Sequence, residues 1–133
     1  NHIVSFLKTQ SQLYQVIDLG TQSLDSVDYP DFANSVCEKL KNTDSHATLG
    51  VLICGSGQGM CIRANKYSHI RASLVYNDEI AKLSREHNDS NVICLGSRFC
   101  TAANAEKWIN IFLNTPFSEG RHRQRVDKLS CST

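Results

Sequence analysis

Three glycines at alternate positions, directly after a buried-looking apolar run, are the feature that most constrains the fold of this chain. Residues 49–53 are apolar, the run stops at Cys54, and Gly55-Ser56-Gly57-Gln58-Gly59 follows. A short apolar run of this kind predicts a buried parallel strand. Glycine permits a tight turn and lets backbone N–H groups approach a ligand closely. The sequence therefore predicts a strand, a turn and a helix, with an anion cradle at the carboxyl edge of a sheet.

Strand-like and helix-like segments alternate along the chain. We predict strands at residues 15–19, 49–54, 70–76 and 91–95. The predicted helices cover residues 1–8, 30–41, 60–65 and 121–130, with two more that begin at Asn77 or Asp78 and at Thr101, the latter ending at Thr115-Pro116. This alternation predicts an α/β fold, a three-layer α/β/α sandwich around an open parallel sheet.

Length and composition are those of an ordinary globular domain. The 133 residues suit a single domain over residues 1–133, and 41% of them are hydrophobic. A net charge of +1 indicates neither nucleic acid nor a membrane surface as a partner. No stretch is long and apolar enough for a membrane span, and the start lacks a signal-peptide pattern.

Six cysteines raise the question of disulfides or a metal. No Cys-x-x-Cys pair occurs, so a zinc site is not expected. Cys54 and Cys94 lie in or at the end of strand-like runs, where thiols pack as small hydrophobic groups. We therefore expect free thiols and a reducing, cytoplasmic location.

The glycine turn and Cys54 leave several interpretations open. The turn can hold a phosphate or an oxyanion, be a purely structural turn, or bind a dinucleotide, although its third glycine comes one residue early for that fingerprint. Asp78 lies where a ribose-binding acid would be expected. Cys54 is either an inert strand-end residue or a thiolate beside converging N–H groups, able to remove a proton next to a carbonyl.

Each of the other charged and polar candidate residues has a structural and a functional interpretation. His87, followed by Asn88, is either a helix C-cap or an acid–base group at the ligand edge of the sheet. Arg121 and Arg125 are four apart on a predicted helix and form either a solvated basic face or a phosphate grip, with His122 nearby. Arg98, just after the strand that ends at Gly96, is a further candidate for anion binding.

Taken together, the motifs resemble the ribose-5-phosphate isomerase B and galactose-6-phosphate isomerase family over nearly the whole chain. The resemblance rests on these segments in this order: Asp28-Tyr29-Pro30, residues 50–59, Ala64-Asn65-Lys66, Ile70-Arg71-Ala72, residues 83–92, Gly96-Ser97-Arg98 and residues 120–125. It implies a flavodoxin-like, Rossmann-like sheet and a homodimer, able to pair into a tetramer, with active sites at the subunit interface. It also implies isomerisation of an aldose phosphate and a ketose phosphate in the non-oxidative pentose phosphate pathway, without metal or cofactor.

The resemblance also implies roles for individual residues. Cys54 is the base, and the loop Gly55, Gly57, Gln58 and Gly59 holds the enediolate oxygens. His87 helps to open the sugar ring and Asn88 binds the sugar. Arg98, Arg121 and Arg125 contact the substrate, and Ser56 is expected to assist proton movement.

The chain departs from the family pattern at several points. The family begins with a strand ending in Asp-His, which we expect upstream of this chain, so that its first strand is missing here. Met60 stands where the branch without the cysteine has glutamate, which favours ribose 5-phosphate. Arg63 and His69 stand where relatives have small residues, and we expect surface changes there. A hexose 6-phosphate isomerase (galactose or allose 6-phosphate) and a non-catalytic phosphosugar-binding relative remain alternatives.

Overall fold

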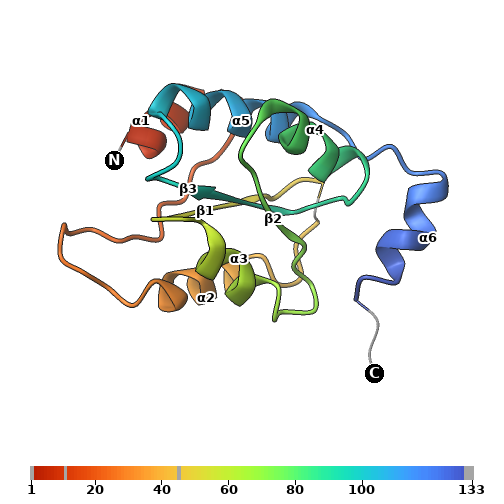
Figure 1. Ribbon diagram of the computed structural model, residues 1–133, viewed down its shortest axis with the longest axis horizontal. Helices are drawn as coiled ribbons and strands as arrows, with labels where there is room; N and C mark the ends of the chain where they lie inside the picture. The colour runs from red at the N-terminus through yellow and green to blue at the C-terminus, as the bar shows by residue number, and fades with distance from the viewer. Residues whose placement is uncertain (1, 11, 45, 131–133) are drawn as a thin grey trace.

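A computed structural model describes residues 2–10, 12–44 and 46–130. Its centre is a parallel sheet of three strands in the order β1-β3-β2, namely β1 (Gly50–Cys54), β3 (Val92–Gly96) and β2 (Ala72–Leu74) (Figure 1). Gly50 is level with Val92, and Cys54 is level with Gly96. The carboxyl ends of β1 and β3 therefore meet at one edge of the sheet.

Helices cover both faces of this sheet, as the alternating pattern predicts. In Figure 1, α1, α4 and α5 lie above the sheet, while α2 and α3 lie below it. The bounds are α1 His2–Lys8, α2 Tyr29–Lys39, α3 Gln58–Ala64, α4 Asp78–Glu86 and α5 Ala102–Asn114. The predicted three-layer α/β/α architecture is confirmed.

The central strand β3 divides the core into two halves. All five of its residues are buried. Ile93 and Leu95 pack with Ile109 and Phe112 of α5, whereas Val92 and Cys94 face the side of α2 and α3. Successive side chains of a strand point to opposite faces of the sheet. A strand that is covered on both faces therefore needs apolar residues at every position.

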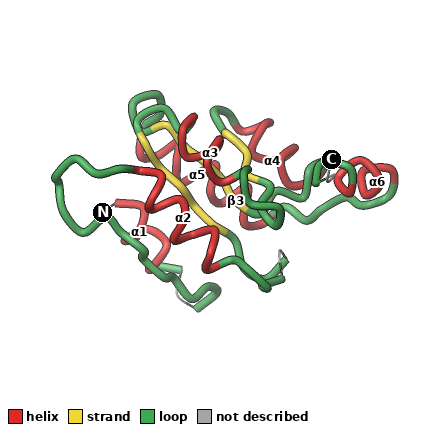
Figure 2. Tube along the Cα trace, turned by 90° about the horizontal axis from the view of Figure 1, so that it is seen from below, coloured by secondary structure: helices red, strands yellow, loops and turns green. Residues whose placement is uncertain are grey.

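The last helix, α6 (Arg121–Asp127), lies apart from the sheet. Both views show it projecting from one end of the molecule (Figures 1 and 2). Only Val126 of this helix is buried. The predicted basic helix is confirmed, although it ends at Asp127, three residues earlier than expected.

The predicted strand at residues 15–19 is wrong, because the structure has no regular element there. Ile17 is 51% exposed. A strand is stable only when its N–H and C=O groups pair with a neighbour. Within the described ranges, no strand lies beside this segment to pair with it.

We expected Arg63 and His69 to be changes on the surface, but both side chains make contacts between elements. Both are half-buried. The Arg63 guanidinium donates to the Asn34 side chain of α2 over 2.6 Å, and a ring nitrogen of His69 lies 2.7 Å from the Cys37 carbonyl oxygen. They tie α3 and the segment after it to α2.

The expectation of free thiols is confirmed for the five cysteines that the structure describes: Cys37, Cys54, Cys61, Cys94 and Cys100. Cys131 lies outside the described residues. None of the helices in the described ranges has the length and hydropathy that a membrane crossing requires.

Candidate active site

Cys54 ends β1 at the carboxyl edge of the sheet, where the glycine loop turns back towards it. The Gly57 N–H donates a hydrogen bond to the Cys54 sulfur over 3.2 Å, and the thiol is half-buried. The Gln58 N–H donates to the Ser56 hydroxyl over 3.3 Å. A backbone donor aimed at the sulfur stabilises negative charge on it. The loop and the thiol thus form one polar unit at the start of α3.

Gly57 is the residue that makes this turn possible. Its φ of +77° lies in the left-handed region, and a Cβ there would come within 2.6 Å of a Leu74 methyl carbon and 2.9 Å of the Leu95 carbonyl carbon. Neither the conformation nor the space admits an L side chain without displacement. The loop can therefore lie directly on β2 and β3.

Arg98 reaches the same loop from the turn after β3. Its backbone N–H donates to the Gly55 carbonyl over 3.0 Å, and its guanidinium carbon would be 3.2 Å from a Cβ at position 55. The Ser97 N–H donates to the Cys54 carbonyl over 2.9 Å. The exposed guanidinium of Arg98 therefore adds positive charge beside the loop, while its role in anion binding stays a prediction.

Tyr29 also lies against the loop, and sequence reasoning assigned it no role. A Cβ at Gly59 would be only 2.2 Å from its hydroxyl oxygen. The sequence did offer one indication of a role for Tyr29, because Asp28-Tyr29-Pro30 is one of the segments that carry the family resemblance. A cavity of about 450 Å³ opens beside the loop, lined by Ser56, Gln58, Leu74, Val75, Tyr76, Gly96, Phe99, Cys100 and Trp108.

The other predicted site residues gather at the opposite edge of the sheet. His87 caps the C-terminus of α4, and its ring stacks on that of His122 with centroids 4.2 Å apart and an interplanar angle of 14°. The Ser118 N–H donates to the Glu86 carbonyl over 3.0 Å, which holds the approach to α6 against the end of α4. Exposed Arg121 and Arg125 stand on either side of His122 in α6.

This position corrects one expectation. His87 and Asn88 precede β3, so they lie at the amino edge of the sheet and not at its ligand edge. A five-residue strand spans about 13 Å, and that length separates this group from Cys54 at the other end of β1. Figure 1 shows α6 beyond the end of the sheet from which the strands start.

The histidine pair has an electrostatic asymmetry. Burial, the facing His87 and the guanidinium groups of Arg121 and Arg125 lower the pKa of His122. Two stacked imidazolium rings would repel each other, so this arrangement favours the neutral form of His122. His87 therefore faces a ring whose protonation is disfavoured, with two arginines close by.

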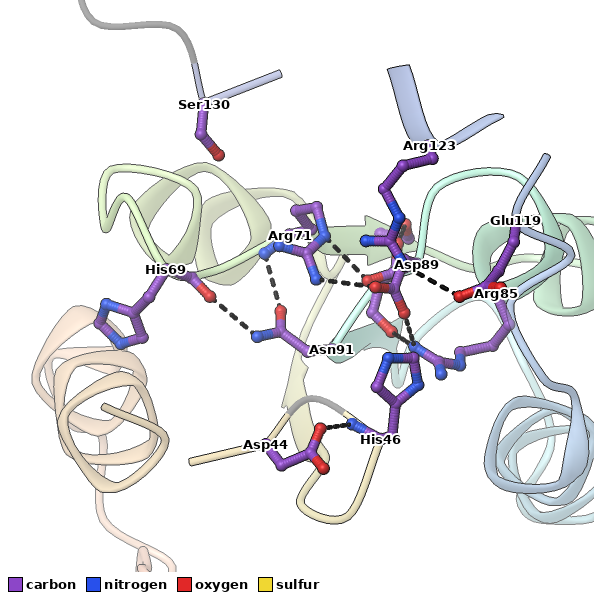
Figure 3. Close-up of polar contacts among 12 residues, drawn as sticks. Asp44, His46, His69, Arg71, Arg85, Asp89, Asn91, Glu119, Arg123 and Ser130 are labelled. Atoms are coloured by element: carbon purple, nitrogen blue, oxygen red, sulfur yellow. Dashed lines mark hydrogen bonds and ion pairs between the residues drawn. The ribbon is translucent and has the colours of Figure 1, made fainter. Parts of the chain in front are cut away.

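Beneath His87 and Asn88 lies a buried ionic cluster that the sequence did not reveal. Asp89 is 2% exposed and lies between Arg71 and Arg85 (Figure 3). Its carboxylate oxygens are 3.3 Å from the Arg71 guanidinium and 3.2 Å from that of Arg85. Arg85 and Asp89 are four residues apart in the sequence, whereas Arg71 lies on another segment, and only the packing shows that all three meet.

The other described cysteines lie outside the glycine turn. The Asn65 side-chain amide donates to the Cys61 sulfur over 3.7 Å, and a hydrogen bond with Cys94 lowers the pKa of the Cys61 thiol. Cys37 and Cys94 are fully buried, and burial raises the pKa of the Cys37 thiol to about 11. Burial also raises the pKa of Cys100. Among the described residues, no three His, Cys, Asp or Glu side chains converge as a metal site would require.

Comparison with known proteins assigns the chain to a family. The Ribose/Galactose Isomerase family model matches residues 1–129. The probable ribose-5-phosphate isomerase B of Mycoplasma genitalium is 44% identical over 128 residues, 96% of this chain and 82% of the relative. The ribose-5-phosphate isomerase B of Escherichia coli is 40% identical over 116 residues, 87% of this chain and 76% of the relative.

Solved structures agree with this assignment. The crystal structure of the Mycoplasma genitalium ribose-5-phosphate isomerase B with bound ribulose-5-phosphate has a TM-score of 0.90 at 43% identity, over 96% of this chain and 83% of the other. The type B ribose 5-phosphate isomerase of Trypanosoma brucei has a TM-score of 0.89 at 41% identity, over 97% of this chain and 86% of the other. This chain belongs to the ribose/galactose isomerase family.

Proposed function

We propose that this protein interconverts ribose 5-phosphate and ribulose 5-phosphate, with Cys54 as the base. The observation that carries the proposal is the Gly57 N–H directed at the Cys54 sulfur within the glycine loop. The family assignment supports it, as does the related structure that holds ribulose-5-phosphate at 43% identity. The free thiols fit a cytoplasmic location, which is part of the same proposal.

The proposed chemistry is a proton transfer through an enediolate. The Cys54 thiolate takes the proton from C2 of the open-chain aldose, and the electron pair forms the C1–C2 double bond while O1 becomes an oxyanion. Loop N–H groups from Gly55 to Gly59 stabilise that charge, and one such donor is worth about 3 kcal/mol. The thiol then returns the proton to C1, and Ser56 helps to move the hydroxyl proton from O2 to O1.

The second group of residues supplies ring opening and binding. His87 moves the protons that open the ring, and Asn88 binds the sugar. Arg121 and Arg125 are one helical turn apart on an exposed face, so both can bind the phosphate dianion. Within the described ranges no acidic side chain pairs with either of them, whereas Arg123 between them pairs with Glu119 at 3.2 Å.

Because the two groups lie at opposite edges of one sheet, we propose a homodimer in which each site combines the Cys54 edge of one protomer with the His87 and α6 edge of its partner. A two-fold dimer forms two such sites at once, because the same contact is made twice. The apolar side chains of Phe99 and Tyr76 beside the loop, 78% and 62% exposed, fit an interface.

Replacing the base tests the chemistry directly. We expect Cys54→Ala to lower kcat for ribose 5-phosphate by about a hundred- to ten-thousandfold, because a general base contributes that much. Cys61→Ala is the matched control, since Cys61 is also a half-buried free thiol but lies on α3 with its sulfur towards the Ala72 carbonyl. Wild-type turnover by Cys54→Ala would show that another group is the base.

The sugar specificity needs a separate measurement. Comparing kcat/KM for ribose 5-phosphate with the values for allose and galactose 6-phosphates distinguishes a pentose from a hexose isomerase. Buried Met60, in place of the other branch's glutamate, favours the pentose. Binding without turnover would indicate a non-catalytic phosphosugar-binding protein, and a thermal shift with NAD would indicate a dinucleotide site.

The upstream strand with its Asp-His pair stays a prediction. β1 pairs with β3 on one side, and none of the strands in the described ranges pairs with its other side. Adding such a strand is expected to raise activity and thermal stability together, because it would pair the free edge of β1.

A further inference from the structure

The turn that carries His87 and Asn88 is held from inside the molecule by buried charges. Asp89 follows it directly, is 2% exposed and has a φ of +45°, a left-handed conformation that is uncommon for a residue other than glycine. Its N–H donates to the Arg85 carbonyl over 3.2 Å. A residue in this conformation persists where its surroundings over-determine it.

Arg85 reaches three parts of the chain at once. It is 3% exposed, and one terminal nitrogen donates to the Asp89 carboxylate over 3.2 Å and also to the Ser90 carbonyl. Its Nε donates to the Thr115 carbonyl over 3.3 Å, in the segment between α5 and α6. One guanidinium therefore joins the turn after α4 to the segment that leads to Arg121 and Arg125.

Arg71 closes the cluster from the other side. Its Nε donates to the Asp89 carbonyl over 2.9 Å, and its terminal nitrogen lies 3.3 Å from the carboxylate (Figure 3). The Asn91 side chain accepts the Arg71 N–H over 2.7 Å and donates to the His69 carbonyl over 2.9 Å. The turn is thereby fixed to the start of β2 as well.

Stability alone is a weak reason for such a cluster. Taking a carboxylate and two guanidinium groups out of water costs free energy that their attraction often only just returns. What the cluster does supply is a fixed geometry, because a planar guanidinium holds several acceptors in set directions. The segments that it joins are those that carry His87, Asn88, Arg121 and Arg125.

We propose that Arg85 and Asp89 are positioning residues that hold His87 and Asn88 in a fixed arrangement with Arg121 and Arg125, so that the sugar ring and the phosphate are bound in register. The proposal rests on the function proposed above. It predicts that disturbing the buried pair changes the His87–His122 stacking and the binding of substrate, although neither Arg85 nor Asp89 touches it.

The decisive variants change the geometry of the buried pair with little change in side-chain volume. Lysine in Arg85→Lys keeps the positive charge opposite Asp89 but cannot reach the Thr115 and Ser90 carbonyls together. Asp89→Asn keeps the shape and removes the charge. Lys82→Met is the matched control, since Lys82 is on the same helix and pairs with Glu86 at 3.7 Å in an exposed contact.

The test measures the KM for ribose 5-phosphate and the imidazole NMR signals, and a loss of folding stability alone would change neither. We expect Arg85→Lys and Asp89→Asn to raise KM for ribose 5-phosphate about tenfold or more, because small displacements of binding groups are costly. We also expect the imidazole NMR signals of His87 and His122 to shift as their stacking changes. Lys82→Met is expected to leave KM and both signals unchanged.

The outcomes separate the two proposals. Variants that only lower the melting temperature, with KM and both imidazole signals as in Lys82→Met, would overturn the positioning role. If the unaltered protein does not turn over ribose 5-phosphate, the proposed function fails, whereas the imidazole signals still report whether the buried pair sets the histidine geometry. Shifted signals together with a raised KM would support both.

Discussion

At the scale of single residues, Gly57 shows how one backbone position determines the loop beside Cys54. We expect Gly57→Ala to lower the free energy of unfolding by about 2 kcal/mol or more, since the strained φ alone costs about 1–2 kcal/mol. The added Cβ also meets backbone atoms of Leu95 and Gly96 at 2.9 and 3.1 Å. Denaturant unfolding measures the loss, and turnover of ribose 5-phosphate should fall with it.

Gly120→Ala is the control for this prediction. Its φ of +55° with a ψ of −130° is a combination that L residues rarely adopt, but a Cβ there has no atom within 4 Å. This variant should therefore show the conformational cost without the steric one. Equal losses in the two variants would mean that the loop can move away from β3 at little cost.

A second prediction at this scale concerns alkaline pH. The folded pKa of Cys37 is about 11, against 9.0 for an ordinary thiol, because the side chain is buried. Below pH 9 the thiol is neutral in both states and its contribution to stability is complete. Above that pH the unfolded chain loses the proton first, so stability falls as the pH rises through the folded pKa.

The measurement is denaturant unfolding from pH 8 to about 11 in the presence of a reductant. Cys37→Ala should lose less stability over this range than the unaltered protein, because it lacks the titrating thiol. Parallel curves for the two proteins would show that Cys37 is not buried as the structure has it.

At the scale of single elements, α4 begins at a side-chain cap. The Asn77 side chain accepts the Ile80 N–H over 2.8 Å, so Asn77→Ala should cost about 1 kcal/mol of unfolding free energy. Asp28 also occupies an N-cap position, before α2, but its side chain makes no cap bond. Asp28→Ala is the matched control, and thermal unfolding should show a smaller change for it.

The elements that could be predicted are those with local causes. The caps at Asn77 and Thr101 depend on residues three positions away, and both are confirmed. The apolar run of β3 could also be predicted, because it depends on the residues of the strand itself. Residues 15–19 have a strand-like pattern, but a strand depends on a distant partner, and pattern alone does not reveal whether one lies beside it.

At the scale of the whole molecule, the placement of the two groups predicts complementation between protomers. We expect Cys54→Ala and His87→Ala each to be nearly inactive alone. Unfolding and refolding them together in equal amounts should restore about a quarter of the activity, because half of the dimers are mixed and each mixed dimer has one intact site. The assay is turnover of ribose 5-phosphate after co-refolding.

A pair of variants from the same edge is the control. Cys54→Ala mixed with Gly57→Ala should regain little, since both changes fall in the same half of the site. Restoration in that control but not in the first mixture would contradict a site shared between protomers.

By itself, the sequence determined the order of most elements, the glycine loop after Cys54 and the identity of the family. These depend on local pattern, on backbone conformations open to glycine and on motifs read in order. The tertiary structure alone decided that His87 and Cys54 lie at opposite edges of one sheet and that Asp89 is buried between Arg71 and Arg85. Contacts between residues distant in the sequence follow from packing, because side chains meet only once the chain has folded around its core.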